Sequence, residues 1–522
     1  MRHLRPTATV THEAPCPSYA MAHCGLSGKE RLKYGLILVV YMCVAVFLSS
    51  RDNPWLHSPY VQHVDSAMFF MGGKAWANGL IPYVDFTDSK GPLLWLIHMV
   101  AYLISHTSYV GMMLTIAPVM AGALYFSWLT AIRILGDARR AMWAAAAMPV
   151  IWFLTLQFIE TRAETYAQLP LAYLLYVMVT GMRSPALLTL ANAFWSGVCI
   201  AALLLIKWSF AAIGGIFVVG ALICLIPSRG GFCIKYIGAG IAGIVALCVP
   251  FAVYLLSVGA MGGFIHEYFV NTLATTGITG SEKNLLHDFV EHFRDICCAD
   301  IKILIPVILI LAGSLLAFLK FHFRRWLPLC ATALMVFVTI STMLWPYYLQ
   351  IIGFAGICLC SWGIGMVLSC LPGRWANRAV KLWPAALVLF MLPCLRHGLW
   401  GSELLRGTYT PNDTELADAA ITEWCLKHAI SSPRILYADG LDFGLGLTTR
   451  ALPASKHWFR QFGATPEMED ERAAAEGSKV ADILVVAYGR DGDSPERLGY
   501  ELIYGSESPL MVFSRFCVYA RR

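Results

Sequence analysis

Long apolar runs recur along the chain between residues 34 and 400, and short charged or Pro- and Gly-marked breaks separate them. A helix that crosses a bilayer needs about 20 mostly apolar residues, which is close to the length of these runs. The pattern predicts eleven spanning helices, at residues 34–50, 109–131, 141–157, 165–181, 187–206, 208–226, 235–257, 301–319, 327–344, 347–370 and 382–399. The chain is therefore expected to be a mostly α-helical, polytopic membrane protein.

Residues 92–106 form a shorter apolar run that is interrupted by His98, so it suits a helix lying in the membrane interface or dipping into it. If this run does not cross, basic residues collect on one side of the membrane, as the positive-inside rule expects of cytoplasmic loops. Those loops contain the single acid Asp137 and twelve basic residues: Arg133, Arg139, Arg140, Arg183, Arg229, Lys235, Lys320, Arg324, Arg325, Arg374, Arg378 and Lys381. We therefore expect residues 92–106 to stay on the outer face.

This topology divides the chain into three parts. Residues 1–33 carry basic side chains but no apolar region, so they are interpreted as a cytoplasmic tail and not as a cleavable signal peptide. Residues 34–401 form the transmembrane domain, with outer loops at residues 51–108 and 258–300. Residues 402–522 are expected to form a soluble extracytoplasmic domain, anchored by the multi-pass part to the cell (inner or plasma) membrane.

The last part of the chain alternates one helical pattern with several short strand-like runs. The helical pattern covers residues 414–430. Strand-like runs follow at residues 434–438, 481–487, 498–504 and 511–519. This order predicts a small α/β domain with three or four strands.

The composition agrees with a membrane protein, because 58% of the 522 residues are hydrophobic and only 14% are charged. The net charge of +6 is explained by the cytoplasmic anchors, so no nucleic-acid partner is expected. Most of the 16 cysteines lie in apolar runs, where Cys acts as a small hydrophobe. The chain lacks Gly-rich nucleotide loops, a nucleophile elbow and a zinc-binding His motif, so neither an obligatory cofactor nor a metal ion is expected.

The outer loop between residues 65 and 95 holds charged residues that could carry chemistry. Asp65 precedes a segment, residues 66–78, that fits an amphipathic helix in the interface, which would hold its carboxylate at the membrane surface. Asp65 could also be the N-cap of this helix, and the two roles are compatible. Asp85 and Asp88 lie in turn-like sequence and are either turn residues or substrate ligands.

Lys90 precedes Gly91 and Pro92, and a proline at the first helical position before an apolar run is a helix-start signal. Free N–H groups, the helix dipole and the ammonium would converge there on a phosphate, and Gly91 would let a ligand approach the backbone. The alternative is a lysine that snorkels to the membrane interface. The sequence thus offers one candidate anion site.

Two more polar groups are expected at the outer ends of spans. Glu160, Arg162 and Glu164 lie at the junction of two predicted spans, as a solvated turn or as part of a site. Lys207 lies where two apolar runs meet, as a contact to a phosphate or lipid headgroup or as an interface anchor. The charges of the membrane region therefore gather at the predicted outer face.

In combination, these features resemble the GT-C glycosyltransferases, in particular the family 39-like branch of protein O-mannosyltransferases and lipid A aminoarabinose transferases. The family has an outer-loop acid at an interfacial helix, matched by Asp65, and a Gly-x-x-Pro-Tyr sequence, matched by GLIPY at residues 79–83. It also has Lys-Pro-Pro or Lys-Gly-Pro before an apolar segment, matched by Lys90-Gly91-Pro92. The resemblance covers the membrane region and is weak beyond the first 210 residues.

Two further matches and two departures complete the resemblance, and the first departure is that the common Lys-Pro-Pro is Lys90-Gly91-Pro92 here. Glu164 matches a second acid at the next outer turn, and Tyr347 and Tyr348 match a Tyr-rich turn late in the membrane region. The common Asp-Glu pair of the family is Asp65-Ser66 here. The acid assignment in the first loop therefore depends on Asp65 alone.

The resemblance implies transfer of a sugar from a polyprenyl-phosphate donor to a glycan, glycolipid or protein acceptor at the outer membrane face, with inversion. It implies that Asp65 takes the acceptor proton and that Glu164 orients the acceptor or supports Asp65. Lys90 and Lys207 would bind the donor phosphate. Other expected substrate ligands are Asp85, Asp88, Arg162, Tyr347 and Tyr348. Because the leaving group is already a phosphate, no nucleotide or metal is needed, and membrane lipids, donor and acceptor are the expected partners.

Two other classes of function compete with a transferase. A transporter or flippase of lipid-linked sugars would also need outward polar residues, but the sequence has no inverted repeat and its charges lie in loops. A non-catalytic scaffold would explain the C-terminal domain but not the constellation around Lys90. The transferase is therefore the favoured interpretation.

Overall fold

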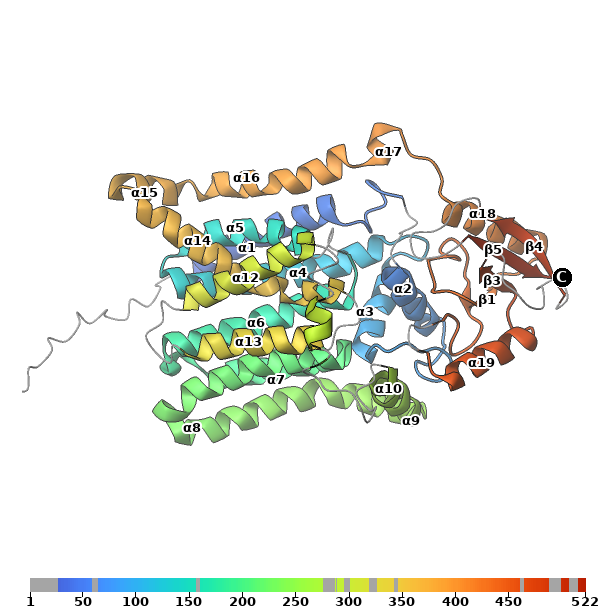
Figure 1. The fold of residues 1–522 in the computed structure, drawn as a ribbon, viewed down its shortest axis with the longest axis horizontal. Helices are drawn as coiled ribbons and strands as arrows, with labels where there is room; N and C mark the ends of the chain where they lie inside the picture. The colour runs from blue at the N-terminus through green and yellow to red at the C-terminus, as the bar shows by residue number, and fades with distance from the viewer. Residues whose placement is uncertain are drawn as a thin grey trace, which may run out of the picture.

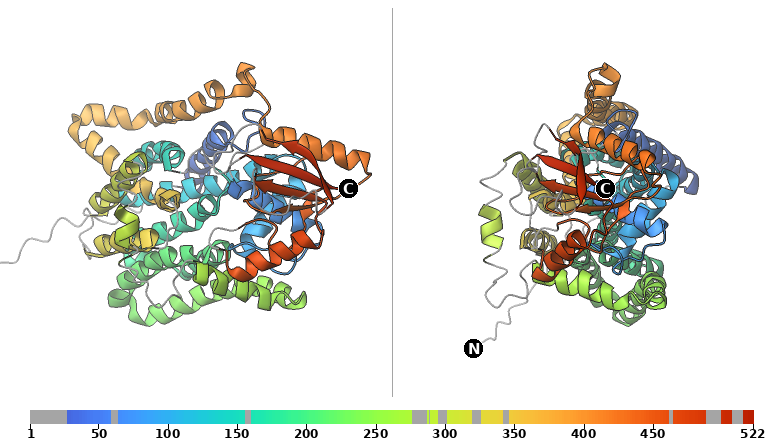
Figure 2. Two further views of the ribbon diagram at one scale, coloured as in Figure 1. Left: turned by 45° about the vertical axis from the view of Figure 1, so that its right-hand side comes forward. Right: turned by 90° about the vertical axis from the view of Figure 1, so that its right-hand side faces the viewer.

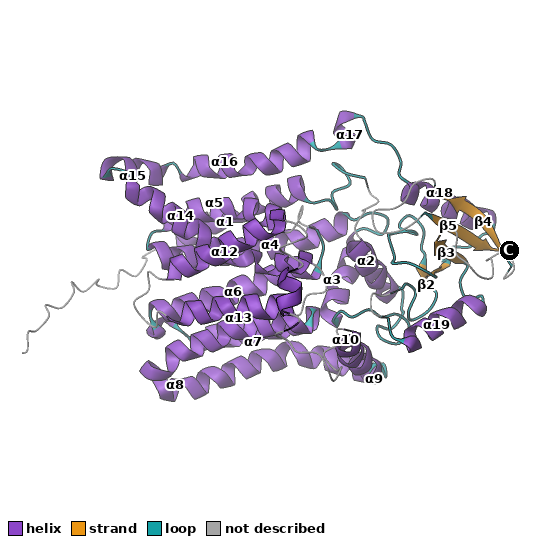
Figure 3. Cartoon of the chain, in the orientation of Figure 1, coloured by secondary structure: helices purple, strands orange, loops and turns teal. Residues whose placement is uncertain are grey.

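The computed structural model describes residues 27–58, 64–155, 160–275, 287, 289–294, 301–318, 326–341, 346–460, 464–487, 499–506 and 515–522. Long helices form a bundle, and the strands lie in a small domain at one end of it (Figures 1 and 3). The long helices are α1 (Gly28–Ser49), α4 (Val110–Leu135), α5 (Ala138–Thr155), α6 (Ala163–Arg183), α7 (Leu190–Ile206), α8 (Trp208–Ser257), α12 (Ile301–Phe318), α13 (Trp326–Ser341), α14 (Gly356–Cys370) and α16 (Trp383–Leu395). The predicted fold class is confirmed.

Several of these helices can cross a bilayer by length and composition. In the described ranges five qualify: α1, α4, the two parts of α8, and the segment Tyr348–Cys370. A sixth is added if α15 (Gly373–Lys381) and the segment Trp383–Trp400, which are bent by 64° at their junction, form one span. The protein is thus a multi-pass membrane protein, whereas the count of eleven spans and the domain boundaries stay predictions.

Four predicted spans have an unexpected local form. Residues 208–226 and 235–257 belong to one helix, α8, whose backbone leaves the helical region at Arg229 (φ −148°, ψ 47°). Pro227 precedes this kink and cannot donate a helical hydrogen bond. The predicted span 347–370 begins as a 3₁₀-helix, η3 (Pro346–Ala355), and continues as α14, while α16 ends in a π-helical turn, η4 (Arg396–Trp400).

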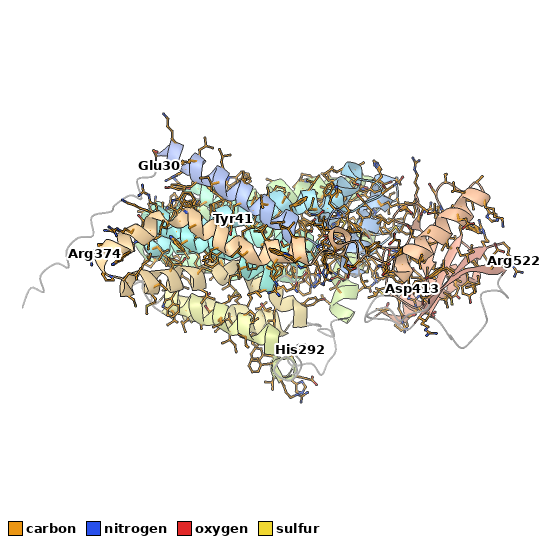
Figure 4. All side chains as sticks on the ribbon, turned by 90° about the horizontal axis from the view of Figure 1, so that it is seen from above. Glu30, Tyr41, His292, Arg374, Asp413 and Arg522 are labelled. Carbon is orange, nitrogen blue, oxygen red and sulfur yellow. The ribbon has the colours of Figure 1, made fainter. Side chains whose placement is uncertain are left out.

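The bundle has two unlike ends. Viewed from above, Glu30 of α1 and Arg374 of α15 lie at one end, and Asp413 and Arg522 of the C-terminal part lie at the other (Figure 4). Arg139, near the start of α5, lies close enough to Glu30 to act on its charge, so it lies at the same end. The arrangement follows the charge pattern of the sequence, and the side of the membrane that each end faces stays a prediction.

Helices α2 (Val64–Ala77) and α3 (Pro92–Ile104) lie between the bundle and the C-terminal domain (Figure 1). They pack closely because α2 has glycines at the contact: a Cβ on Gly72 would lie 2.2 Å from the Trp95 ring, and one on Gly73 would lie 2.3 Å from the His98 carbonyl carbon. Helix α3 begins at Pro92, as the sequence predicts, and has 13 residues. Asp65 is the second residue of α2, so it lies inside the first turn and not before the helix.

The C-terminal domain is built on a five-stranded sheet in the order β2-β1-β3-β5-β4. Its strands are β1 (Arg434–Tyr437), β2 (Leu452–Pro453), β3 (Ile483–Ala487), β4 (Tyr500–Gly505) and β5 (Phe516–Arg521). β1 pairs in parallel with β2 and β3, whereas β5 is antiparallel to β3 and β4. Both turned views place this sheet at the same end of the bundle (Figure 2).

Helices accompany the sheet and connect it to the bundle. Helix α18 (Asp413–Lys427) was predicted, but β2 and α19 (Pro466–Gly477) were not. A short helix, α17 (Glu403–Arg406), links the bundle to this domain. After α8, the short helices α9 (Met261–Phe264), η2 (Ile265–Asn271) and α10 (Thr272–Thr275) cover a further part of the same end, and η1 (Pro185–Leu187) precedes α7. Residues 511–514 of the last predicted strand lie outside the described residues.

Candidate active site

The start of α3 lies directly against the end of α7. The Gly91 N–H donates to the Ile206 carbonyl at 3.0 Å. A Cβ on Gly91 would lie 2.1 Å from the Leu205 carbonyl oxygen, so only glycine allows this approach. The contact brings Lys90, before α3, close to Lys207, the residue between α7 and α8.

Lys207 joins two other segments of the predicted site. Its Nζ lies 3.6 Å from Oε1 of Glu164, in the first turn of α6. The same Nζ lies 3.6 Å from the centroid of the Tyr348 ring, in η3. Glu164 is buried, and the side chain of Lys207 is only 15% exposed, so the three groups interact away from bulk water.

Lys90 has its own set of polar partners. Its Nζ lies 3.3 Å from Oδ2 of Asp88 and donates to the Ser89 hydroxyl at 3.2 Å. Its carbonyl accepts a hydrogen bond of 2.8 Å from the Tyr83 hydroxyl. The loop before α3 is thereby held in one conformation, with a largely buried ammonium whose side chain is 14% exposed.

The electrostatic surroundings of Lys90 connect it to the other predicted residues. Burial lowers the pKa of the Lys90 ammonium, but Asp88, Tyr348, Asp65 and Glu164 together more than offset this and raise the pKa above its ordinary value. The ammonium therefore stays protonated at neutral pH. Residues from α2, the loop before α3, α6 and η3 thus act on one lysine.

The remaining predicted site residues of these segments are Asp85, Arg162 and Tyr347. Asp85 accepts the Ile81 N–H at 2.7 Å within the turn, which fits its interpretation as a turn residue. Arg162 forms an ion pair of 2.7 Å with Glu160 just before α6. Tyr347 belongs to η3, and its side chain lies outside the described residues.

A neighbouring buried acid was not predicted. Asp52 follows α1 by three residues and is 1% exposed. Burial raises its pKa to about 7. Its Oδ2 accepts hydrogen bonds from the Thr161 hydroxyl at 2.8 Å and from the Thr161 N–H at 3.3 Å. The Arg51-Asp52 pair at the end of a span was the only signal in the sequence, and such pairs usually mark a solvated turn.

The C-terminal domain contacts α2 through a buried lysine. Lys74 of α2 is buried, and its Nζ donates to the carbonyls of Gly446 at 2.7 Å and Thr449 at 2.8 Å. Burial lowers the pKa of Lys74 to about 8, and the carboxylates of Asp418 and Asp442 act against this shift. The lysine on an apolar helix face was a signal that the sequence analysis did not use.

A second contact joins the C-terminal domain to the loop before α3 and to η2. The Thr87 N–H donates to the Lys456 carbonyl at 3.0 Å, and the Lys456 ammonium pairs with the buried carboxylate of Glu267. His457 lies next to it, with Nε2 3.2 Å from Oε2 of Glu471 and 3.9 Å from Oε1 of Glu267. The C-terminal domain therefore contacts α2, the loop before α3 and η2.

Within the described stretches, no group of three or more His, Cys, Asp or Glu side chains is arranged to hold a metal ion.

This protein is similar to known proteins in its fold. No protein-family model and no curated protein matches this sequence. Among solved structures, ArnT from Cupriavidus metallidurans in the apo state has a TM-score of 0.59 at 16% identity, over 94% of this chain and 98% of that chain. ArnT bound to undecaprenyl phosphate has a TM-score of 0.59 at 14% identity, over 95% of this chain and 98% of that one.

A third solved structure, the oligosaccharyltransferase of Archaeoglobus fulgidus with Zn and sulfate, has a TM-score of 0.41 at 13% identity, over 86% of this chain and 68% of that chain. The two ArnT structures, each matched over nearly its whole length, show that this chain has the polytopic fold of ArnT.

Proposed function

We propose that this protein is a glycosyltransferase that moves a sugar from a polyprenyl-phosphate carrier to an acceptor at the outer face of the cell membrane. One observation carries the proposal: Lys90, Lys207, Glu164 and Tyr348, from four separate segments, meet with Asp65 near them at one end of the bundle. The matching ArnT fold, which has been solved with undecaprenyl phosphate, supports this kind of reaction.

Lys90 and Lys207 bind the phosphate of the donor. In the reaction the bond between the anomeric carbon and the phosphate oxygen breaks, and its electron pair stays on the phosphate, which gains a negative charge. Two ammonium groups in a poorly hydrated site stabilise that developing charge far better than water does. In the free enzyme Asp88 and Glu164 balance these ammonium groups, and a donor phosphate takes over that role.

Asp65 is the base of this reaction. As the acceptor oxygen attacks the anomeric carbon from the opposite face, its proton passes to the Asp65 carboxylate, and the configuration inverts. Glu164 orients the acceptor or supports Asp65, with Lys207 fixing its carboxylate. Proton removal by a positioned carboxylate is typically worth about 10² to 10⁴ in rate.

The acceptor, a glycan, glycolipid or protein, enters from the side that the C-terminal domain covers. The C-terminal domain contacts Lys74 of α2 and, through Lys456, Glu267 of η2, and these contacts support a role of this domain in acceptor choice. Asp88, Tyr347 and Arg162 remain candidate ligands of donor or acceptor. The reaction as proposed needs no nucleotide and no metal ion, because the leaving phosphate is already attached to the sugar.

The decisive test uses the purified full-length protein with a polyprenyl-phosphate sugar, and it measures release of polyprenyl phosphate. We expect Asp65→Asn to lose about 10² to 10⁴ in rate with little change in melting temperature. We expect Lys90→Met to weaken donor binding and slow release, and Lys90→Arg to restore part of both. Lys235→Met, at an exposed position of α8, is the matched control.

The same assay separates the competing function. A flippase would move a labelled lipid-linked sugar between leaflets of a vesicle without cleaving the sugar–phosphate bond. Bond cleavage by the parent that Asp65→Asn abolishes supports the transferase. Movement between leaflets without cleavage, or an Asp65→Asn variant that transfers at nearly the parent rate, would contradict the proposal.

A further inference from the structure

A buried chain of hydrogen bonds links three elements beside the candidate site. Asp52, after α1, accepts from the Thr161 hydroxyl at 2.8 Å, and the Thr161 and Ser66 hydroxyl oxygens lie 3.0 Å apart. Thr161 lies just before α6, and Ser66 lies in the first turn of α2. All three side chains are buried, at 1%, 0% and 0% exposure respectively, so water does not compete for these bonds.

The two ends of this chain adjoin the two proposed acids. Ser66 follows Asp65 directly, and Thr161 lies three residues before Glu164. A bond between Ser66 and Thr161 therefore ties the backbone that carries Asp65 to the backbone that carries Glu164. Ser66 stands where the family has the glutamate of its Asp-Glu pair. Its hydroxyl, directly after Asp65 in the sequence, shares a hydrogen bond with Thr161.

The number of available protons decides which group donates in each of these hydrogen bonds. The Thr161 hydroxyl has one proton, and an ionised Asp52 can only accept, so Thr161 donates to Asp52 and Ser66 donates to Thr161. A neutral Asp52 can donate instead, and then Thr161 is free to donate to Ser66. Within the described part of the chain, the second carboxyl oxygen of Asp52, Oδ1, is buried and has no hydrogen-bond partner.

Charged groups from each neighbouring element face Asp52. Arg51 comes from the end of α1, Glu160 and Arg162 from the turn before α6, and the Tyr166 phenol from α6 itself. Burial raises the pKa of Asp52 to about 7; Thr161 and Arg162 lower it, and Glu160 raises it. Its charge therefore changes near neutral pH.

We propose that Asp52 is a positioning residue that, through Thr161 and Ser66, holds the first turn of α2 against the start of α6 and so sets the distance between Asp65 and the acceptor. This inference rests on the proposed role of Asp65. Asp52 touches neither substrate nor the reacting atoms. Its effect falls on turnover and not on donor affinity, because Lys90 and Lys207 belong to other segments.

A matched pair of variants at Thr161 tests the link. Thr161→Val keeps the shape but removes the hydroxyl, whereas Thr161→Ser keeps the hydroxyl. We expect Thr161→Val to lower kcat about tenfold or more with KM for the donor nearly unchanged, since a displacement of about 1 Å can cost 10² in rate. Thr161→Ser retains most of the parent kcat, and the control is Ser314→Ala, which removes a buried hydroxyl that donates to the Ile310 carbonyl within α12.

Asp52→Asn supplies the readout that a purely structural role would not change. Asparagine accepts the same hydrogen bonds but does not titrate. We expect kcat of the parent to change near pH 7 as Asp52 titrates, and we expect kcat of Asp52→Asn not to change there. A parent and an Asp52→Asn variant with the same pH profile would overturn the inference, as would a Thr161→Val variant with parent kcat.

A measurement without catalysis separates this inference from the proposed function. Hydrogen exchange of the backbone amides in the first turn of α2 should be faster in Thr161→Val than in the parent, with Thr161→Ser close to the parent. If the parent cleaves no donor, the proposed function fails. The exchange rates of these amides still report whether the hydrogen bonds between Asp52, Thr161 and Ser66 hold α2 in place. Unchanged exchange in Thr161→Val refutes the link itself.

Discussion

Gly91 offers a sharp test of the site, because the structure fixes how far its neighbours must move. The Gly91 backbone has φ −82°, which alanine adopts easily, so Gly91→Ala acts only through the added methyl group. That Cβ would lie 2.1 Å from the Leu205 carbonyl oxygen, whereas ordinary contacts begin at 3.4 Å, so α3 and α7 must separate by about 1.3 Å. The obstacle is backbone and cannot rotate away as a side chain can.

The displacement acts on both proposed phosphate ligands. The 3.0 Å bond from Gly91 N–H to the Ile206 carbonyl would break, which costs about 1 kcal/mol, and overpacking adds about 1–3 kcal/mol. Lys90 would move away from Lys207, and a misplacement of about 1 Å can cost about 10² in rate. We therefore expect Gly91→Ala to release polyprenyl phosphate about 10² times more slowly than the parent.

The assay compares release rate, donor affinity and melting temperature of the detergent-purified variant. Gly215→Ala in α8 is the control, because its added methyl group would meet no other described residue outside the adjoining backbone of its own helix within 4 Å. A well-folded Gly91→Ala protein with activity within about threefold of the parent would show that the spacing of α3 and α7 does not matter. The proposed phosphate site would then be wrong.

Three other expectations follow from contacts outside the phosphate site. Lys74→Met keeps the apolar stem but leaves the Gly446 and Thr449 carbonyls buried and unpaired, so we expect unfolding free energy to fall by about 2–5 kcal/mol, seen as a lower melting temperature. Burial lowers the pKa of His457 to about 4, so the neutral His457 side chain stabilises the fold above pH 6.5 and this stabilisation is lost as pH falls toward 4. The melting temperature of the parent should therefore fall over that pH range, and His457→Gln should make that fall smaller. A cysteine at Arg139, in a background without reactive thiols, should resist an impermeant reagent added outside the cell, and ready labelling would reverse the topology.

The sequence by itself determined the features that depend on neighbouring residues. Helix length and hydrophobic content indicated the bundle, and the proline at the start of residues 92–104 correctly marked the first residue of α3. The helix from Asp413 and most strands of the C-terminal domain were also evident from local periodicity. These signals are local because a helix or strand is stabilised first by residues a few positions apart.

Only the tertiary structure decided which polar residues share a site. Lys207, Glu164 and Tyr348 are far apart in the sequence and meet through the packing of α6, α7 and η3, which no local pattern encodes. The buried roles of Asp52 and Lys74 were hidden for the same reason: a charge near a helix end usually lies in water. Whether such a group is buried depends on the elements that cover it, and long-range packing alone brings those elements together.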